Sequence, residues 1–165
     1  MHLRSRRQRG FTLVEIMVVV LIISLLAMVA IPSLMRIQRR AKTTAIMNDF
    51  RVFAAAFSSY AQETGQWPPD TAAGVLPPLM AGRIKADAFT RTTPMGGKYN
   101  WEYNQTHFGV KYKAAISITA TASAPLPLDV NQLTDLENHI DSQFNWLDGS
   151  FHLGTGIVPL YIIEP

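Results

Sequence analysis

A long apolar segment dominates the pattern of hydrophobic and polar residues near the start of the chain. It runs from Phe11 to Ile31, and its 21 residues would span roughly 31 Å as a helix, about the thickness of a bilayer's hydrocarbon core. Glu15 is the only charged residue in it. A carboxylate inside a bilayer costs on the order of 2 to 3 kcal/mol even on the mildest insertion scales, so Glu15 needs a specific reason to be there.

Helical periodicity continues beyond this segment. Five apolar residues follow one another at spacings of 4, 3, 4 and 3, which places them on one stripe of an amphipathic helix. Gly65 and the pair Pro68-Pro69 predict the end of this helix, because glycine favours the C-terminal cap and proline cannot extend a helix. The stripe consists of Ile46, Phe50, Phe53, Phe57 and Tyr60.

Together, the two patterns predict one very long helix. A helix over residues 11–64 would be roughly 80 Å long, which is too long for one small domain, so we expect half of it to project. Pro32 lacks the amide hydrogen that a helix interior needs. We therefore expect a helix kink at Pro32, by bending or by local melting.

The chain changes character after Gln66. Residues 67–82 are dense in Pro and Gly and predict a connecting region with at most one short helix. Two alternating runs, 99–103 and 108–120, each predict a strand with one buried face, and the polar link 104–107 joins them into a hairpin. The alternating apolar residues are Tyr99, Trp101 and Tyr103, and then Phe108, Val110, Tyr112, Ala114, Ile116, Ile118 and Ala120.

Two further elements are predicted near the C-terminus. Residues 129–144 suit an amphipathic helix. Residues 156–164 predict a strand, in which Pro159 is most comfortable at an edge because it has no amide hydrogen to donate. The apolar side of the predicted helix consists of Val130, Leu133, Leu136 and Ile140.

This order of elements predicts an α+β fold, in which a long N-terminal helix packs on a small antiparallel sheet. The apolar stripe of the helix and the even-numbered face of residues 108–120 each need a partner, and each is the obvious partner of the other. We therefore expect a membrane stem and a globular head.

Composition narrows the choice of function. With 48% hydrophobic and 16% charged residues, the 165-residue chain is too apolar for a disordered protein. The formal charge of +3 includes four arginines within residues 1–10, and residues 11–165 carry 11 positive and 12 negative charges, a balance of −1. This distribution gives little support to nucleic-acid binding. Cysteine is absent, which excludes disulfides, thiol nucleophiles and Cys-based metal sites.

No arrangement of residues in the head predicts catalysis. Residues 141–146 only faintly resemble a calcium loop, because Trp146 occupies the place of the turn glycine. Ser150 lacks the G-x-S-x-G setting of a nucleophile, and the glycines form no phosphate-binding pattern. The four histidines have no ligand spacing. The sequence therefore predicts no enzyme, cofactor or metal; the histidines are His2, His107, His139 and His152.

Three interpretations of the N-terminus are open. An ordinary secretory signal is disfavoured, because the apolar run exceeds the usual 7 to 15 residues, contains an acid and meets only a poor cleavage site at residues 27–30. A plain single-span anchor fits the length but leaves Glu15 unexplained. The third interpretation uses the whole stretch RGFTLVE, residues 9–15.

This stretch resembles the class III signal of the type IV pilin superfamily, which combines a basic leader, a glycine before the scissile bond, an N-terminal phenylalanine and a glutamate as fifth mature residue. Pro32 stands where such pilins commonly place a proline. The resemblance implies cleavage between Gly10 and Phe11 by a prepilin peptidase, N-methylation of Phe11 and a leader on the cytoplasmic side. The matching residues are Gly10, Phe11, Thr12, Leu13 and Glu15.

The resemblance also assigns a role to Glu15 and divides the chain. In a packed fibre, an unpaired carboxylate is costly, and we expect the Phe11 amine of a neighbouring subunit to neutralise Glu15 during subunit assembly. The alternative is an acid that is only tolerated at the membrane edge. The expected parts are a cleaved leader (1–10), a membrane and assembly helix (11–31), an amphipathic half-helix (32–64) and a pilin-like head (65–165).

By this resemblance, the chain is expected to be a type II secretion pseudopilin in the bacterial inner membrane, with a periplasmic head. Its expected partners are like subunits, other pseudopilins, the prepilin peptidase/methyltransferase and the inner-membrane assembly platform. The alternatives are a major or minor type IV pilin, or a membrane-anchored binding domain. Because some pseudopilins bind calcium near the C-terminus, Asp141 and Asp148 are calcium candidates, with helix capping and turn formation as the alternative.

Overall fold

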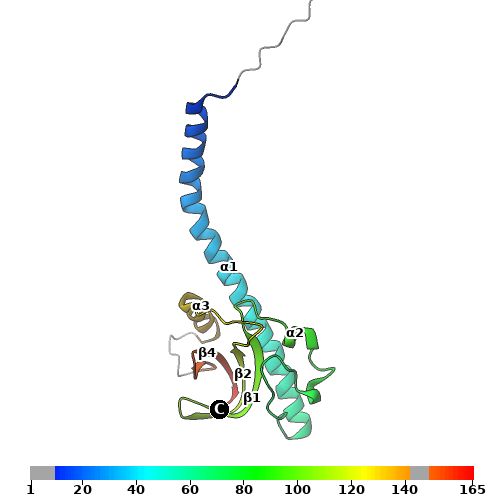
Figure 1. The fold of residues 1–165 in the computed structure, drawn as a ribbon. Helices are drawn as coiled ribbons and strands as arrows, with labels where there is room; N and C mark the ends of the chain where they lie inside the picture. The colour runs from blue at the N-terminus through cyan, green and yellow to red at the C-terminus, as the bar shows by residue number, and fades with distance from the viewer. Residues whose placement is uncertain (1–9, 142–148) are drawn as a thin grey trace, which may run out of the picture. The chain divides into compact units, whose positions relative to one another are not determined.

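The computed structural model describes residues 10–141 and 149–165 (Figure 1). The chain divides into two compact units, Met1–Gln38 and Arg39–Pro165. The first helix, α1 (Leu13–Thr64), runs through Pro32 and begins in the first unit and ends in the second. The predicted kink at Pro32 stays a prediction.

The second unit contains the α+β fold that the sequence predicts. Its four-stranded antiparallel sheet has the order β1-β2-β4-β3, and the second part of α1 packs on it (Figure 1). The short helices η1 (Pro78–Met80) and α2 (Ala86–Thr90) precede the sheet, and α3 (Val130–Ile140) connects its two hairpins. The strands are β1 (Lys98–His107), β2 (Val110–Thr119), β3 (Phe151–Gly154) and β4 (Val158–Glu164).

The core lies between α1 and one face of the sheet, where the amphipathic stripe meets aromatic residues of β1. The ring of Phe57 stacks on Trp101 with centroids 3.8 Å apart. Phe53 meets Tyr99 edge-on at 5.1 Å. These side chains and Phe50 are at most 1% exposed, so the helix-on-sheet prediction is confirmed.

The hairpin differs from its prediction in register and length. The predicted link 104–107 belongs to β1, and the turn is instead Phe108–Gly109, both with positive φ (47° and 80°). This is the backbone that a two-residue type I′ turn requires. Phe108 and Val110 are consequently exposed at the hairpin end instead of buried.

The far end of this hairpin is tied to the β3–β4 turn. The Phe108 amide donates to Thr155 Oγ1 (3.3 Å), and the Thr155 amide donates to His107 Nδ1 (3.1 Å). On this part of the sheet a second small core forms, in which Tyr112 packs instead of joining the face toward α1. That second core consists of Tyr112, Ala115, Leu160 and Ile162.

Three further details depart from the sequence-based expectations. Pro159 lies in β4, an interior strand, but the pairing of β4 with β2 begins only at Leu160, so the missing amide hydrogen breaks no bond there. Val130 is exposed at the first position of α3. The strand β3 and the helix α2 have no sequence prediction, because four and five residues are too short to show a period.

Candidate assembly site at the start of the first helix

Thr12 and Glu15 form a reciprocal cap at the start of α1. The Glu15 carboxylate accepts hydrogen bonds from the Thr12 amide (2.8 Å) and the Thr12 hydroxyl (2.9 Å). In return, Thr12 Oγ1 accepts from the Glu15 amide (3.2 Å). This is the capping box T-x-x-E, in which two of the helix's free backbone donors are satisfied by side chains.

The cap gives Glu15 hydrogen-bond partners within a single chain. The helix N-terminus also carries a partial positive charge that favours a carboxylate in the first turn. Sequence reasoning missed the role of Thr12, although the spacing of Thr12 and Glu15 is the signal that identifies a capping box.

Gly10 and Phe11 precede the cap outside the helix. Both are exposed, and nothing lies within 4 Å of the position that a Cβ on Gly10 would take. The rest of the predicted leader, residues 1–9, lies outside the described residues. The roles of Gly10, Phe11 and Glu15 in processing and assembly stay predictions.

The first part of α1 exposes an uninterrupted apolar surface. Every large apolar side chain from Phe11 to Ile37 is exposed, Phe11 itself by 85%. Among the described residues, α1 is the one helix that is long and apolar enough to cross a membrane. Fully burying such side chains is worth about 1.5 to 3 kcal/mol each, so this surface requires a lipid or protein environment.

A polar cluster fixes α1 to the sheet inside the head. Asp49, on α1, accepts from the Tyr99 hydroxyl (2.6 Å) and forms an ion pair with Arg91. Burial and then the Asp49 carboxylate raise the pKa of Tyr99 above its usual range. Asp49, Tyr99 and Arg91 are bonded to one another, so this cluster stabilises the fold.

The remaining candidates in the head also have structural contacts. Asp141 accepts from the Phe151 amide (2.6 Å), which agrees with capping and turn formation. Asp148, the second calcium candidate, and Trp146 lie outside the described residues. In residues 10–141 and 149–165, no group of three or more His, Cys, Asp or Glu side chains is arranged to hold a metal ion.

Two histidines of the head, His107 and His152, each contact neighbouring polar groups. His107 Nε2 contacts Glu102 Oε2 at 2.5 Å. His152 Nδ1 contacts the Tyr112 hydroxyl (2.8 Å), and its Nε2 contacts the Gly149 carbonyl (3.0 Å). These side chains join strands and turns.

The N-terminal residues also carry a similarity to known proteins. The prokaryotic N-terminal methylation motif matches residues 5–31. A type II secretion system core protein G of Pseudomonas aeruginosa is 39% identical over 66 residues, which cover 40% of this chain and 46% of that protein. The protein of the same name in Escherichia coli is 33% identical over 102 residues, or 56% of this chain and 70% of that protein. The chain belongs to the type IV pilin superfamily.

Members of this superfamily are structural proteins and not enzymes. The chain spans less than half of the Pseudomonas aeruginosa protein (46%). Relatives named as fimbrial or type IV pilins also match.

The pilin fold extends through the head. The structure of the major type IV pilin PilA1 from Clostridium difficile has a TM-score of 0.53 at 16% identity, covering 77% of this chain and 97% of that one. At this identity, the likeness concerns the fold alone.

Proposed function

We propose that this chain is a structural subunit of a type II secretion pseudopilus, which assembles through its N-terminal helix and supports protein export. The observation that carries the proposal is the exposed apolar half of α1 with one carboxylate in its first turn. A tether alone needs the apolar surface but has no use for a charged residue there. An assembling helix has a use for it, because the charge can select one packing register.

The mechanism rests on a change of partner for Glu15. In the lone subunit, Thr12 and the helix N-terminus stabilise the carboxylate while the helix lies in the membrane. Cleavage after Gly10 creates a Phe11 amine, and N-methylation keeps it able to carry a positive charge. In the fibre, the amine of a neighbouring subunit neutralises Glu15, so a register shifted by one turn leaves a charge unpaired in an apolar environment.

The proposal defines location and partners. The mature chain is held in the bacterial inner membrane by residues 11–31, with the head in the periplasm. Its partners are like subunits, other pseudopilins, the prepilin peptidase/methyltransferase and the inner-membrane assembly platform. The support is the methylation motif together with relatives that carry the name of the secretion core protein.

Two variants separate the assembly role of Glu15 from its capping role. Glu15→Gln keeps an acceptor for Thr12 but removes the charge, and Thr12→Val removes the two hydrogen bonds of the Thr12 hydroxyl but keeps the charge. We expect Glu15→Gln to insert and be cleaved but to form no fibres, and Thr12→Val to assemble at reduced yield. Fibres are counted by electron microscopy after overexpression of each variant as the only copy. If Glu15→Gln assembles like the unmodified chain, the charge has no assembly role.

Processing is tested at Gly10. N-terminal sequencing of the mature protein is expected to begin at Phe11, and Gly10→Leu is expected to leave the precursor uncut in the membrane. A mature chain that begins near Ile31 would instead support an ordinary signal peptide.

The choice between pseudopilus and pilus is tested by complementation. In a strain whose secretion core protein G is deleted, the chain is expected to restore export of the secreted enzymes. Restored twitching or surface pili in a pilin-deleted strain, without restored export, would favour the type IV pilin alternative. Ligand binding by the head without fibre formation would favour the membrane-anchored binding domain.

A further inference from the structure

His107, the last residue of β1, lies between two partners that require different protonation states of its ring. Nε2 lies 2.5 Å from Glu102 Oε2, and because a carboxylate only accepts, Nε2 carries a hydrogen and donates it. Nδ1 lies 3.1 Å from the amide nitrogen of Thr155, in the turn between β3 and β4. A backbone amide can only donate, so Nδ1 presents a lone pair and the ring is the neutral Nε2–H tautomer.

The Glu102 carboxylate is buried, and the neutral ring leaves its charge without a counter-charge. Only 7% of its side chain is exposed. Its Oε1 accepts from the Ser117 hydroxyl and from Asn100 Nδ2 (3.2 Å), and both of these donors are neutral. In the described part of the chain, its ion-pair partner is His107. Glu102 therefore favours a second proton on this ring, whereas the Thr155 amide excludes one.

The other groups around His107 leave this conflict in place. The Tyr112 ring, from β2, lies 6.3 Å from the imidazole, and its hydroxyl bonds to His152 of β3. Glu102 also interacts with Asp70, which precedes the sheet. Burial raises the pKa of Asp70, and the charge of Glu102 adds to the increase. Asp70 adds negative charge on the Glu102 side, which also favours a protonated ring.

The turn between β3 and β4 depends on its contacts with the β1–β2 hairpin. A Cβ on Gly154 would lie 2.7 Å from His107 Nδ1, so the ring and the turn backbone are in close contact. Ile157, in the same turn, has a φ of 61°, a costly conformation for a β-branched residue. The second hydrogen bond, from the Phe108 amide to Thr155 Oγ1, is longer (3.3 Å) than the bond to Nδ1.

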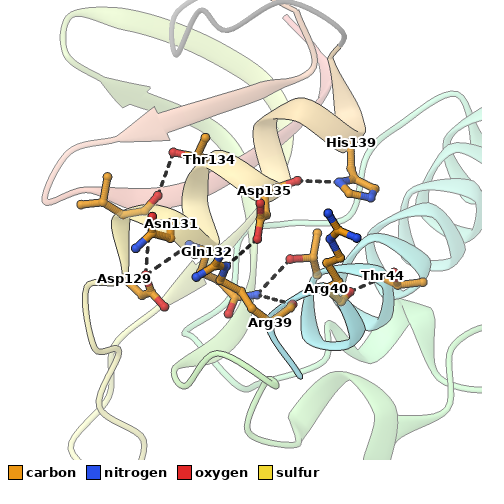
Figure 2. Close-up of polar contacts among 11 residues, drawn as sticks. Arg39, Arg40, Thr44, Asp129, Asn131, Gln132, Thr134, Asp135 and His139 are labelled. Atoms are coloured by element: carbon orange, nitrogen blue, oxygen red, sulfur yellow. Dashed lines mark hydrogen bonds and ion pairs between the residues drawn. The ribbon is translucent and has the colours of Figure 1, made fainter. Parts of the chain in front are cut away.

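The other two histidines of the described head can take up a proton without opposing an amide. His139 Nδ1 lies 2.8 Å from the Asp135 carbonyl, which only accepts, so Nδ1 already donates and a second proton goes to Nε2 (Figure 2). His152 contacts the Gly149 carbonyl through Nε2 and the Tyr112 hydroxyl through Nδ1, and a hydroxyl can rotate to accept. Among the described histidines, His107 alone faces a group that can only donate.

We propose that His107 is a pH-sensitive latch: a proton added at Nδ1 breaks the bond to the Thr155 amide and releases the β3–β4 turn from β1. The Nε2–H bond to Glu102 then becomes a charged pair. The proton comes from water and returns to it as the pH rises, and imidazoles exchange it between about pH 5 and 8. The latch belongs to the fold of the head, goes beyond the proposed assembly function and does not depend on it.

The test follows both sides of the latch in the full chain, held in detergent micelles and isotope-labelled at the nitrogen atoms of histidine and threonine. Nuclear magnetic resonance between about pH 8 and 5 measures the protonation of the His107 ring and the protection of the Thr155 amide from hydrogen exchange. Protection is expressed relative to an unstructured peptide at the same pH. It is expected to fall at least about fivefold, as for the loss of one hydrogen bond, with the midpoint of ring protonation.

An internal control and two variants assign the effect to His107. The Thr93 amide bonds to the Gly97 carbonyl (3.0 Å) and is expected to keep its protection. His107→Gln keeps one donor and one acceptor but cannot titrate, so Thr155 is expected to stay protected over the whole range. His152→Gln removes the neighbouring titratable ring and is expected to leave the midpoint unchanged. If His107→Gln does not fold, the two signals of the unmodified chain still decide.

Every other outcome overturns the proposal. Protonation of His107 without loss of Thr155 protection shows that Nδ1 does not hold the turn. An absence of protonation above about pH 5 shows that the ring does not switch in this range. An equal loss at Thr93 shows a general loosening of the head. A loss that persists in His107→Gln, or disappears in His152→Gln, assigns the titration to another group.

Discussion

The two parts of α1 share one backbone geometry and differ completely in what surrounds them. In the first unit, the large apolar side chains of the helix are all exposed. In the second, Phe50, Phe53 and Phe57 are buried against the sheet. The first part is apolar on all sides, and the second part has one apolar stripe. The helical pattern therefore distinguishes a helix that needs apolar surroundings on every side from a helix that packs on a sheet with one side.

Two of the three acidic residues of α1, Glu15 and Asp49, differ in the same way. Glu15 is held by a residue of its own turn, and its carboxylate remains at the surface of the described chain. Asp49 is held by Arg91 and Tyr99, which come from other elements of the head. The Glu15 carboxylate is therefore accessible, as the proposed exchange of partner with a neighbouring subunit requires, whereas Asp49 is part of the fold.

The largest expected effect comes from truncating one apolar residue in each part of α1. Phe53→Ala is expected to lower the free energy of unfolding of the head by about 3 to 5 kcal/mol, because it leaves a cavity in the core. Leu21→Ala, the matched control on the exposed surface, is expected to change it by less than about 0.5 kcal/mol. Urea titrations of the full chain in detergent, followed by tryptophan fluorescence, measure both. Equal effects would contradict the division of α1 into two parts.

The pair Glu15 and Asp49 gives the next largest difference in stability. Asp49→Asn leaves Arg91 without its counter-charge and weakens the bond from Tyr99, so we expect a loss of about 1 to 3 kcal/mol in the stability of the head. Arg91 is half exposed, and for this reason the expected loss is below that of a fully buried pair. Glu15→Gln is expected to leave the unfolding of the head unchanged. The same urea titrations compare them, and a loss in Glu15→Gln as large as in Asp49→Asn would show that Glu15 also supports the head.

Long periodic elements were predictable from the sequence, because many apolar residues in each element follow the same helical or strand period. The stripe that includes Phe50, Phe53 and Phe57 required a helix with one buried side, and the alternation of residues 112–118 required a strand. At the candidate site, Glu15 could be singled out because it is the one charged residue in an apolar run of 21 residues.

The predictions that were wrong concern single residues whose positions depend on contacts with residues far away in the sequence. The alternation of apolar residues predicts a buried strand position for Phe108, but the register of the hairpin places it in the turn with positive φ. Tyr112 follows the alternation but joins the second core, because the pairing of β2 with β4 is irregular at Ala114/Ala115. No local pattern encodes either fact, since both depend on which strand lies beside β2.

The boundary between the two parts of α1 is tested at Thr43, the first buried residue of the helix. Thr43→Val removes the acceptor for Gln132 while it keeps the shape, and we expect a loss of about 1 kcal/mol in the stability of the head. Thr44→Val is the control, because the Thr44 hydroxyl is exposed and bonds only to the Arg40 carbonyl of its own helix. Its expected change is below about 0.5 kcal/mol by urea titration. If the two variants are equal, the docking of α3 does not fix this end of the head.

The smallest expected effect concerns Glu63, near the end of α1. Hydrogen bonds from Arg83 and Ser59 lower the pKa of Glu63 to about 2 from its usual 4.5. Since the pKa is lower in the folded state, the contribution of Glu63 to stability is fully present above pH 4.5 and is lost as the pH falls toward about 2. Hydrogen bonds from Lys113 and Trp67 also lower the pKa of Glu164, so each variant is compared with the unmodified chain, which contains the same Glu164. Glu63→Gln and Arg83→Gln are each expected to flatten the fall in the urea midpoint between pH 4.5 and 2, and by similar amounts, because they remove the same pair from its two sides. If both variants keep the slope of the unmodified chain, the end of α1 is not held to the head by this pair.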